Sequence, residues 1–242
     1  MIGCIEPDWP APARVRALVT TRAGGASRGE FASFNLAAHV GDDPKALIEN
    51  RRRLRALLPA EPLWLDQVHG NLCVSAAEAA RGTAADACVA HAPGQVCAVL
   101  TADCLPLLFC DRIGSAVGVA HAGWRGLAAG VIESAVAAMD RPADTLLAWL
   151  GPAIGPRNFE VGDEVRAAFV SLDAAAAAAF VPHGNGKWLC SLYQLARQRL
   201  AAAGVRAVTG GAYCTFDEPD RFYSFRRDGR TGRMATLIWL QA

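Results

Sequence analysis

Four short, almost uninterrupted apolar runs in the middle of the chain constrain its fold more than any other feature. They are VCAVLT (96–101), LPLLFC (105–110), AVGVAH (116–121) and TLLAWL (145–150). Continuous apolar runs of this length are typical of β-strands buried on both faces, whereas a strand with one solvated face alternates apolar and polar residues. The sequence therefore predicts a sheet that is covered on both sides.

Helical patterns surround these strands. Asp43 followed by Pro44 is a typical helix start, and Ser191 is a typical N-cap of a later helix that Gly204 ends. Because helices and strands intermingle, we expect one domain over residues 1–242, of the α/β or α+β class with a largely buried central sheet. The other expected helices cover 123–139, 161–170 and the alanine run 174–179, and outer strands are expected at 15–21, 205–208 and 234–240.

Charge, apolar runs and cysteine content indicate which partners and which cellular compartment to expect. Lys and Arg number 24 against 23 Asp and Glu, so the net charge of +1 provides no general attraction for nucleic acid or an anionic membrane. No apolar run reaches the roughly 18–20 residues of a membrane span, and the start, MIGCIEPDWPAP, does not resemble a secretion signal. We therefore expect a cytoplasmic protein whose eight cysteines are reduced.

Three polar side chains stand where an apolar strand opens onto a loop. They are His69 in LDQVHG, Cys104 in TADCLPLL and His121 in AHAGWRG. Their wide separation excludes a zinc finger or ribbon, but two imidazoles and a thiolate suit Zn²⁺ with a fourth position left open. The residues alone leave two alternatives, a metal-free nucleophile pair of Cys104 with His121, or ordinary buried side chains.

Other polar residues lie near these motifs. Arg125 follows the HAGW turn where a helix begins, so its guanidinium and the helix amides could face one anion. Arg51 in ENRRRL is a second anion candidate, with a solvated helix face as the alternative. Asp103 could be a general base or could orient a ligand histidine. Further candidates are Asn35 and Gln67 for substrate or phosphate and Glu160 as an acid/base group. We interpret His39, His91 and His183 as surface or loop residues, although His39 follows several turn residues and could line the same cleft.

Seven motifs over roughly residues 15–240 resemble the YfiH-type laccase-domain family, formerly called multicopper polyphenol oxidoreductases. The pair TADCLPLL and HAGWRG at this spacing is the most specific part of the resemblance. The matching stretches are TTRAGGASRGEFASFNLAAHVGDDP, ENRRRL, WLDQVHG, CAVLTADCLPLLF, HAGWRGLAAGVIE, AWLGPAIGPRNFEVGDEV and FYSFRRDGRTGRMATLIWL.

The resemblance implies both a fold and an activity. It implies one α/β domain with a mixed central sheet flanked by helices, distantly like the cysteine-deamidase toxins. It also implies zinc bound by His69, Cys104 and His121. The implied reactions are phosphorolysis of adenosine, inosine and methylthioadenosine, together with deamination of adenosine, in a monomer or small homo-oligomer. A bacterial branch is linked to peptidoglycan editing, which removes L-serine from UDP-MurNAc-L-Ser.

The older oxidase name can be weighed against the residues. Multicopper oxidases need many imidazole ligands, and this chain has five histidines; its three methionines, Met1, Met139 and Met234, offer no good axial ligand. We therefore disfavour polyphenol oxidation, although a His₂Cys site could bind copper adventitiously. The remaining alternatives are a cysteine hydrolase that uses Cys104 and a binding factor that recognises a muropeptide nucleotide without turnover.

Overall fold

The computed structural model describes residues 2–242 and confirms the predicted α/β class, with most strands in two stacked sheets and the rest in a third, small sheet. In the first sheet neighbouring strands are antiparallel, except for the parallel pair β3 and β6. Its strands, in spatial order, are β1 (Cys4–Ile5), β2 (Val15–Thr20), β14 (Met234–Leu240), β6 (Val96–Thr101) and β3 (Pro62–Leu63).

The second sheet is also mixed. Its outer pairs, β13 with β9 and β4 with β5, are parallel, and the pairs between them are antiparallel. Its strands, in spatial order, are β13 (Ala207–Gly210), β9 (Leu146–Leu150), β7 (Leu105–Asp111), β8 (Val117–Ala122), β5 (Ala87–Ala90) and β4 (Cys73–Ser75).

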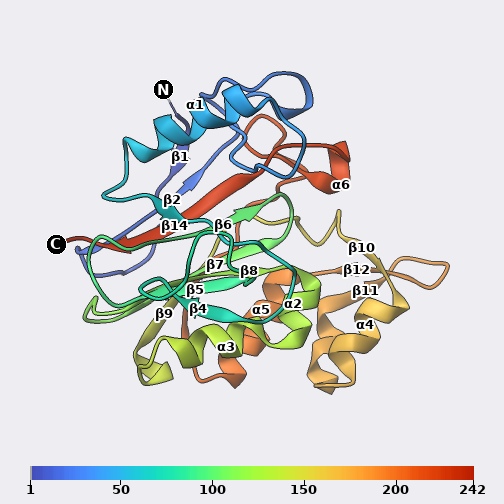
Figure 1. The fold of residues 1–242 in the computed structure, drawn as a ribbon. Coiled ribbons are helices and arrows are strands. Elements are labelled where there is room, and N and C mark those ends of the chain that lie inside the picture. The colour runs from blue at the N-terminus through green and yellow to red at the C-terminus, as the bar shows by residue number, and fades with distance from the viewer. Residues whose placement is uncertain (1) are drawn as a thin grey trace.

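Helices cover the outer face of each sheet, which gives four layers (Figure 1). Helix α1 (Pro44–Arg55) packs Leu54 on the first sheet, and Asp43 caps it by accepting from the Lys45 amide. On the second sheet lie α2 (Trp124–Ala129), α3 (Val131–Ala138) and α5 (Leu192–Ala202). The middle strands are thus buried on both faces, as predicted: helices cover the outer face of each sheet, and the other sheet covers its inner face.

The remaining elements lie beside these layers (Figure 1). Helix α4 (Asp163–Val170) packs against a small antiparallel sheet, and the one-turn helix α6 (Phe225–Asp228) precedes β14. The small sheet contains β10 (Glu160–Gly162), β12 (Lys187–Cys190) and β11 (Phe180–Pro182), and the 3₁₀ helices are η1 (Gly29–Phe31), η2 (Ala143–Thr145) and η3 (Ala174–Ala179).

Several expected boundaries differ from the structure. The pattern at 123–139 predicts one helix, but Gly130 adopts φ +96° and ends α2, so α3 begins as a separate helix. The helix expected from Val161 begins at Asp163, because Val161 pairs with Trp188 in the small sheet. The alanine run forms a 3₁₀ helix, and the strand expected at 205–208 spans 207–210.

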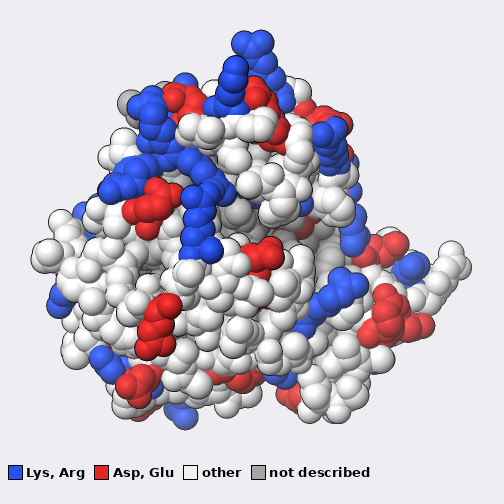
Figure 2. Space-filling view, in the orientation of Figure 1, with Lys and Arg blue, Asp and Glu red and all other residues white. Residues whose placement is uncertain are grey.

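Surface charge is mixed on the face that Figure 2 shows. Acidic and basic side chains are interspersed, and the basic ones gather toward the upper half, where Figure 1 places α1. All eight cysteines are free thiols, as predicted. Among residues 2–242, no helix has the length and apolar character needed to cross a membrane.

A candidate metal centre

The three residues predicted as ligands meet at one end of the stacked sheets. His69 lies on the loop after β3, Cys104 on the turn between β6 and β7, and His121 in β8. Their ligand atoms all lie within 4.8 Å of one another, and the two imidazole rings cross at 79°. His121 is 2% exposed and Cys104 is half-buried, whereas His69 faces solvent. A metal ion could therefore bind all three residues and remain open on one side.

Asp86, at the start of β5, holds both histidines in place. Nδ1 of His121 lies 2.8 Å from the fully buried Asp86 carboxylate. The amides of Val68, His69 and Gly70 donate to the same carboxylate at 3.2, 3.0 and 2.7 Å. Because a carboxylate accepts, Nδ1 of His121 carries the proton and Nε2 is free to ligate, an arrangement common around protein-bound metals.

Close packing at the ligands explains the glycines of HAGWRG. A Cβ on Gly123 would lie 3.0 Å from the Cys104 sulfur and 3.2 Å from Cδ2 of His69. A Cβ on Gly126 would lie 2.6 Å from the Gly70 carbonyl oxygen. The loop that carries His69 can approach the start of α2 only because both positions lack a side chain.

The charges of the three ligands are strongly coupled. Burial raises the pKa of the Cys104 thiol, but His121 and then His69 outweigh burial and lower that pKa to about 6. Burial lowers the pKa of His121, whereas the Cys104 thiolate and Asp86 raise it to about 9. At neutral pH the metal-free chain thus holds a thiolate beside an imidazolium. This pair fits both metal binding, which replaces the imidazole proton, and the nucleophile alternative.

Two cavities meet at Cys104 and Phe225. The first, about 240 Å³, is lined by the three candidate ligands and several other polar side chains; the second, about 140 Å³, is lined mostly by apolar and aromatic side chains. Besides the ligands, the first is lined by His39, Gln67, Leu100, Thr101, Ala102, Phe225 and Arg233. Besides Cys104, the second is lined by Ala102, Asp103, Trp124, Ile154, Phe159, Leu192, Phe225 and Arg226.

The two predicted amide ligands, Gln67 and Asn35, bond the backbone. Gln67 lines the first cavity, where its amide donates to the Leu100 carbonyl at 2.9 Å and accepts from the Leu100 N–H at 2.7 Å. Asn35 is fully buried outside the cavity lining, and its oxygen accepts from the amides of Ala37 and Arg233 at 3.0 Å each. Both side chains support the loops that form the site.

The two predicted anion-binding arginines also lie outside the linings of both cavities. Arg51 donates from Nε and Nη2 to the Leu36 carbonyl at 3.1 and 2.9 Å and stacks on Trp64. Arg125 is exposed, with its guanidinium 4.4 Å from the Trp124 ring centre. Arg51 therefore braces the loop before His39, and Arg125 packs over Trp124, which is a residue of the apolar cavity lining.

The two predicted acid/base carboxylates are in different surroundings. Asp103 lines the apolar cavity, and each of its oxygens accepts a 2.6 Å hydrogen bond, one from the Thr215 hydroxyl and one from the Arg226 amide. Glu160 is exposed on β10, 3.6 Å from His183, and does not line either cavity. The structure thus brings Asp103, and not Glu160, to the site.

Sequence reasoning missed Asp86, Arg233 and Phe225. Asp86 stands directly before a run of apolar residues, like many turn residues, and only its position between two ligand motifs hinted at more. Arg233 and Phe225 lie in the stretch FRRDGRTGR, whose basic composition is typical of a surface loop. The suggestion that His39 lines the same cleft is confirmed.

Known proteins resemble this chain over its whole length. Residues 16–241 match the family model described as multi-copper polyphenol oxidoreductase laccase. A Pseudomonas aeruginosa protein named purine nucleoside phosphorylase is 60% identical over 242 residues, with 100% of both chains covered. Purine nucleoside phosphorylase YfiH of Escherichia coli is 54% identical, over 99% of this chain and 100% of that protein.

Solved structures give the same result. A Neisseria meningitidis crystal structure, 51% identical, covers 99% of this chain and 100% of its own with a TM-score of 0.96. YlmD from Geobacillus stearothermophilus, 32% identical, covers 95% of this chain and 93% of its own with a TM-score of 0.86. The predicted fold and family are thereby confirmed: the chain belongs to the multi-copper polyphenol oxidoreductase laccase family, to which its YfiH-type relatives also belong.

Proposed function

We propose that this chain is a cytoplasmic, zinc-dependent purine nucleoside phosphorylase that cleaves adenosine, inosine and methylthioadenosine with phosphate. The observation that carries the proposal is the convergence of His69, Cys104 and His121, fixed by Asp86, on the floor of a cavity. The names of relatives that are 54–60% identical supply the reaction class. The products would be the free base and a sugar 1-phosphate.

The donor set fits zinc better than copper. Two imidazole nitrogens and one thiolate match the usual ligands of Zn²⁺, and the Asp86 contact to His121 is the support such ligands need. The first cavity lining, drawn from residues 2–242, includes no methionine to serve as the axial ligand of an electron-transfer copper. When bound here, zinc would supply Lewis acidity to an oxygen at its open side.

Arg233 and His39 are the groups that we assign to phosphate. Arg233 bonds the Thr231 and Gly232 carbonyls through Nη1 alone, which leaves Nε and Nη2 to face an anion in the first cavity. Burial, and next to it Arg233, lowers the pKa of His39, so a neutral imidazole can donate one further hydrogen bond. Arg51 supports this wall of the first cavity, and Arg125 contributes only its positive charge outside both cavities.

The apolar cavity is our assignment for the purine. Trp124, Phe159 and Phe225 line it, and aromatic rings offer large flat surfaces to a planar base. With phosphate beside Arg233 in the first cavity, the sugar would lie where the two cavities meet, next to Cys104. This placement brings phosphate to the anomeric carbon while the base leaves into an apolar surrounding.

Adenosine deamination is a second reaction that we assign to the same site. Three protein ligands leave room for a water, which zinc can activate at neutral pH. A group must also move protons to the leaving ammonia. Asp103 is committed to two hydrogen bonds and Glu160 lies outside both linings, so His39 is the group that we assign to this step.

The test incubates zinc-loaded protein with inosine, with and without phosphate. We expect hypoxanthine and ribose 1-phosphate only when phosphate is present. Hypoxanthine release should be lost in Cys104→Ala. It should be normal in the control variant Cys4→Ala, which alters an exposed thiol distant from Cys104 in the sequence. With adenosine as the substrate and no phosphate present, deamination would be detected as the formation of inosine. Absence of phosphate-dependent release, together with L-serine release from UDP-MurNAc-L-Ser by chelator-treated protein, would instead identify the cysteine hydrolase.

A further inference from the structure

Asp103 joins two parts of the site that are far apart in sequence. It precedes Cys104, is 8% exposed, and adopts φ +87°, a left-handed conformation that few residues other than Gly, Asn and Asp accept readily. Oδ1 accepts from the Thr215 hydroxyl and Oδ2 from the Arg226 amide, each at 2.6 Å. The Asp103 carbonyl also accepts from the Ile154 amide at 2.9 Å. Asp103 thus connects the thiol turn to the segment around α6.

The α6 segment (Ser224–Asp228) forms a wall of both cavities through Phe225. That ring is 59% exposed and lies at the boundary where the two cavities meet. Ser224 caps the turn by accepting from the Arg227 amide at 3.2 Å, a contact confined to the segment itself. Because one helical turn has little stability of its own, the position of Phe225 depends on contacts to the rest of the protein.

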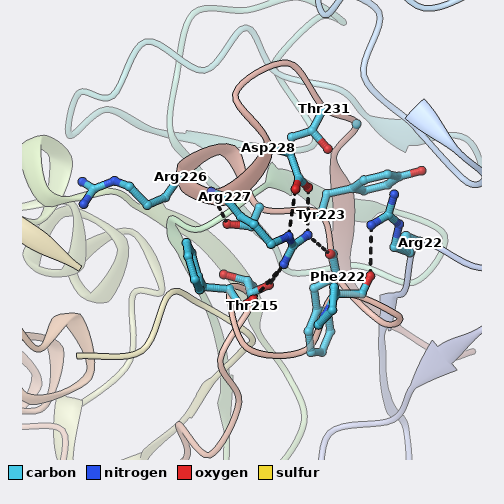
Figure 3. A network of polar contacts seen from close by, with 12 residues as sticks. Arg22, Thr215, Phe222, Tyr223, Arg226, Arg227, Asp228 and Thr231 are labelled. Carbon is cyan, nitrogen blue, oxygen red and sulfur yellow. Dashed lines mark hydrogen bonds and ion pairs between the residues drawn. The ribbon is translucent and has the colours of Figure 1, made fainter. Parts of the chain in front are cut away.

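Several contacts hold this segment: Arg226 donates from Nη1 to the Glu160 carbonyl at 2.8 Å, and two further sets of bonds involve Arg227 and Asp103. The Arg227 guanidinium donates to the carbonyls of Thr215, Phe216 and Phe222 at 2.7, 3.0 and 2.9 Å. Figure 3 shows that guanidinium between the backbone of Thr215 and that of Phe222. Asp103 binds the first turn of α6. Among the hydrogen bonds of residues 2–242, the Asp103 contact is the one that connects α6 directly to a residue beside Cys104.

We infer that Asp103 is a positioning residue, which fastens Phe225 and Arg226 at a fixed distance from Cys104 and so sets the width of the purine cavity. The expected change in the KM for inosine rests on the proposed phosphorolysis, but the fastening of α6 by Asp103 does not. The geometry favours a positioning role over proton transfer for Asp103, because each of its oxygens accepts a short hydrogen bond from a protein group.

A set of three variants separates positioning from acid/base chemistry. In Asp103→Asn the amide oxygen can accept from the Arg226 N–H, and the amide nitrogen can donate to the Thr215 hydroxyl, which is able to turn and accept. Asparagine also tolerates the left-handed backbone. Thr215→Val removes one donor with little change of shape. Asp103→Ala removes both contacts but also strains the left-handed backbone, so Thr215→Val, which leaves that backbone unchanged, is the variant that isolates the hydrogen bond.

We expect Asp103→Asn to keep turnover within about threefold of the parent and to keep its pH profile, since each hydrogen bond has a replacement. For Asp103→Ala, we expect the KM for inosine to rise roughly 10- to 100-fold, with the KM for phosphate and the zinc content unchanged. Thr215→Val should show a smaller rise in the same constant. A loss of 100-fold or more in Asp103→Asn, with α6 intact, would overturn the inference in favour of an acid/base role.

Amide hydrogen exchange of residues 224–228 tests the structural part without any turnover. We expect faster exchange in Asp103→Ala and Thr215→Val, and parental exchange in Asp103→Asn. Unchanged exchange in all three variants would overturn the inference. If the parent protein releases no base from inosine, the proposed function fails, but the exchange rates still decide whether Asp103 fastens α6.

Discussion

Asp86 and Asp103 are both buried aspartates beside the same three ligands, but they hold different parts of the site. Asp86 accepts from three successive amides of the His69 loop and contacts the ring of His121. Asp103 accepts from one hydroxyl and one amide of the segment that forms the cavity wall. The comparison indicates that ligand geometry and substrate fit are supported by separate carboxylates, and that each can be changed without the other.

The same substitution at both positions gives the largest expected difference. In Asp86→Asn the amide nitrogen cannot accept, so two of the buried or part-buried groups that donate to Asp86 lose their partner. We expect zinc affinity to fall roughly 10- to 100-fold, and the free energy of unfolding to fall by about 2–6 kcal/mol for two unsatisfied groups.

Asp103→Asn, where the hydroxyl partner can reverse its role, should keep parental zinc affinity and stability. Competition with a chromophoric chelator and chemical unfolding measure the two quantities. If both variants lose zinc equally, the two carboxylates do not divide the work, and the comparison fails.

A second pair of variants contrasts a residue of the cavity wall with an exposed residue outside both linings. Arg233→Lys keeps the charge but loses the planar fork, so kcat/KM for phosphate should fall by roughly 10- to 150-fold, the loss of one charge-assisted hydrogen bond. Arg125→Lys, at an exposed position over Trp124, should stay within about twofold. Steady-state kinetics at varied phosphate measures both. The opposite ranking would return the phosphate site to Arg125.

The smallest expected effect concerns the ligand thiol itself. The metal-free protein should be alkylated at Cys104 with a midpoint near pH 6, and the rate should decline as pH falls through that value because the thiolate gains a proton. Burial raises the pKa of Cys73, Cys110 and Cys190 to about 12, so they should react little.

At pH 7 the gain over an ordinary thiol should be only about two- to threefold, because a thiolate of low pKa is also a weaker nucleophile. Mass spectrometry after timed iodoacetamide treatment gives the rate at each cysteine. A midpoint near ~8.5, the ordinary thiol value, would mean that the histidines do not stabilise the thiolate.

Much of the fold followed from local patterns. The middle strands could be predicted because continuous apolar runs have few other stable arrangements, and the helix at Pro44 because its start signals are explicit. The division into two sheets could not be predicted, since a buried face packs equally well on a helix or on another sheet. The break between α2 and α3 at Gly130 could not be predicted either, because the sequence does not distinguish a glycine that adopts the left-handed conformation from one that a helix tolerates.

The convergence of the three candidate ligands could be predicted, but most of their surroundings could not. His69, Cys104 and His121 each stand where an apolar stretch meets a loop, which is visible in the sequence. Arg51 and Asn35 look like ligand-binding residues in a motif, yet their hydrogen bonds go to backbone groups of nearby loops. Whether a polar side chain bonds a substrate or a loop depends on tertiary contacts, and the sequence alone does not reveal them.

The central claim is that His69, Cys104 and His121 together hold one zinc ion that phosphorolysis requires. Elemental analysis of purified protein tests it most directly, with Cys104→Ala as the variant and Cys4→Ala as its control. We predict one zinc per chain in the parent and in Cys4→Ala, and almost none in Cys104→Ala. Undiminished zinc in Cys104→Ala, or a parent protein that never binds zinc, would contradict the account.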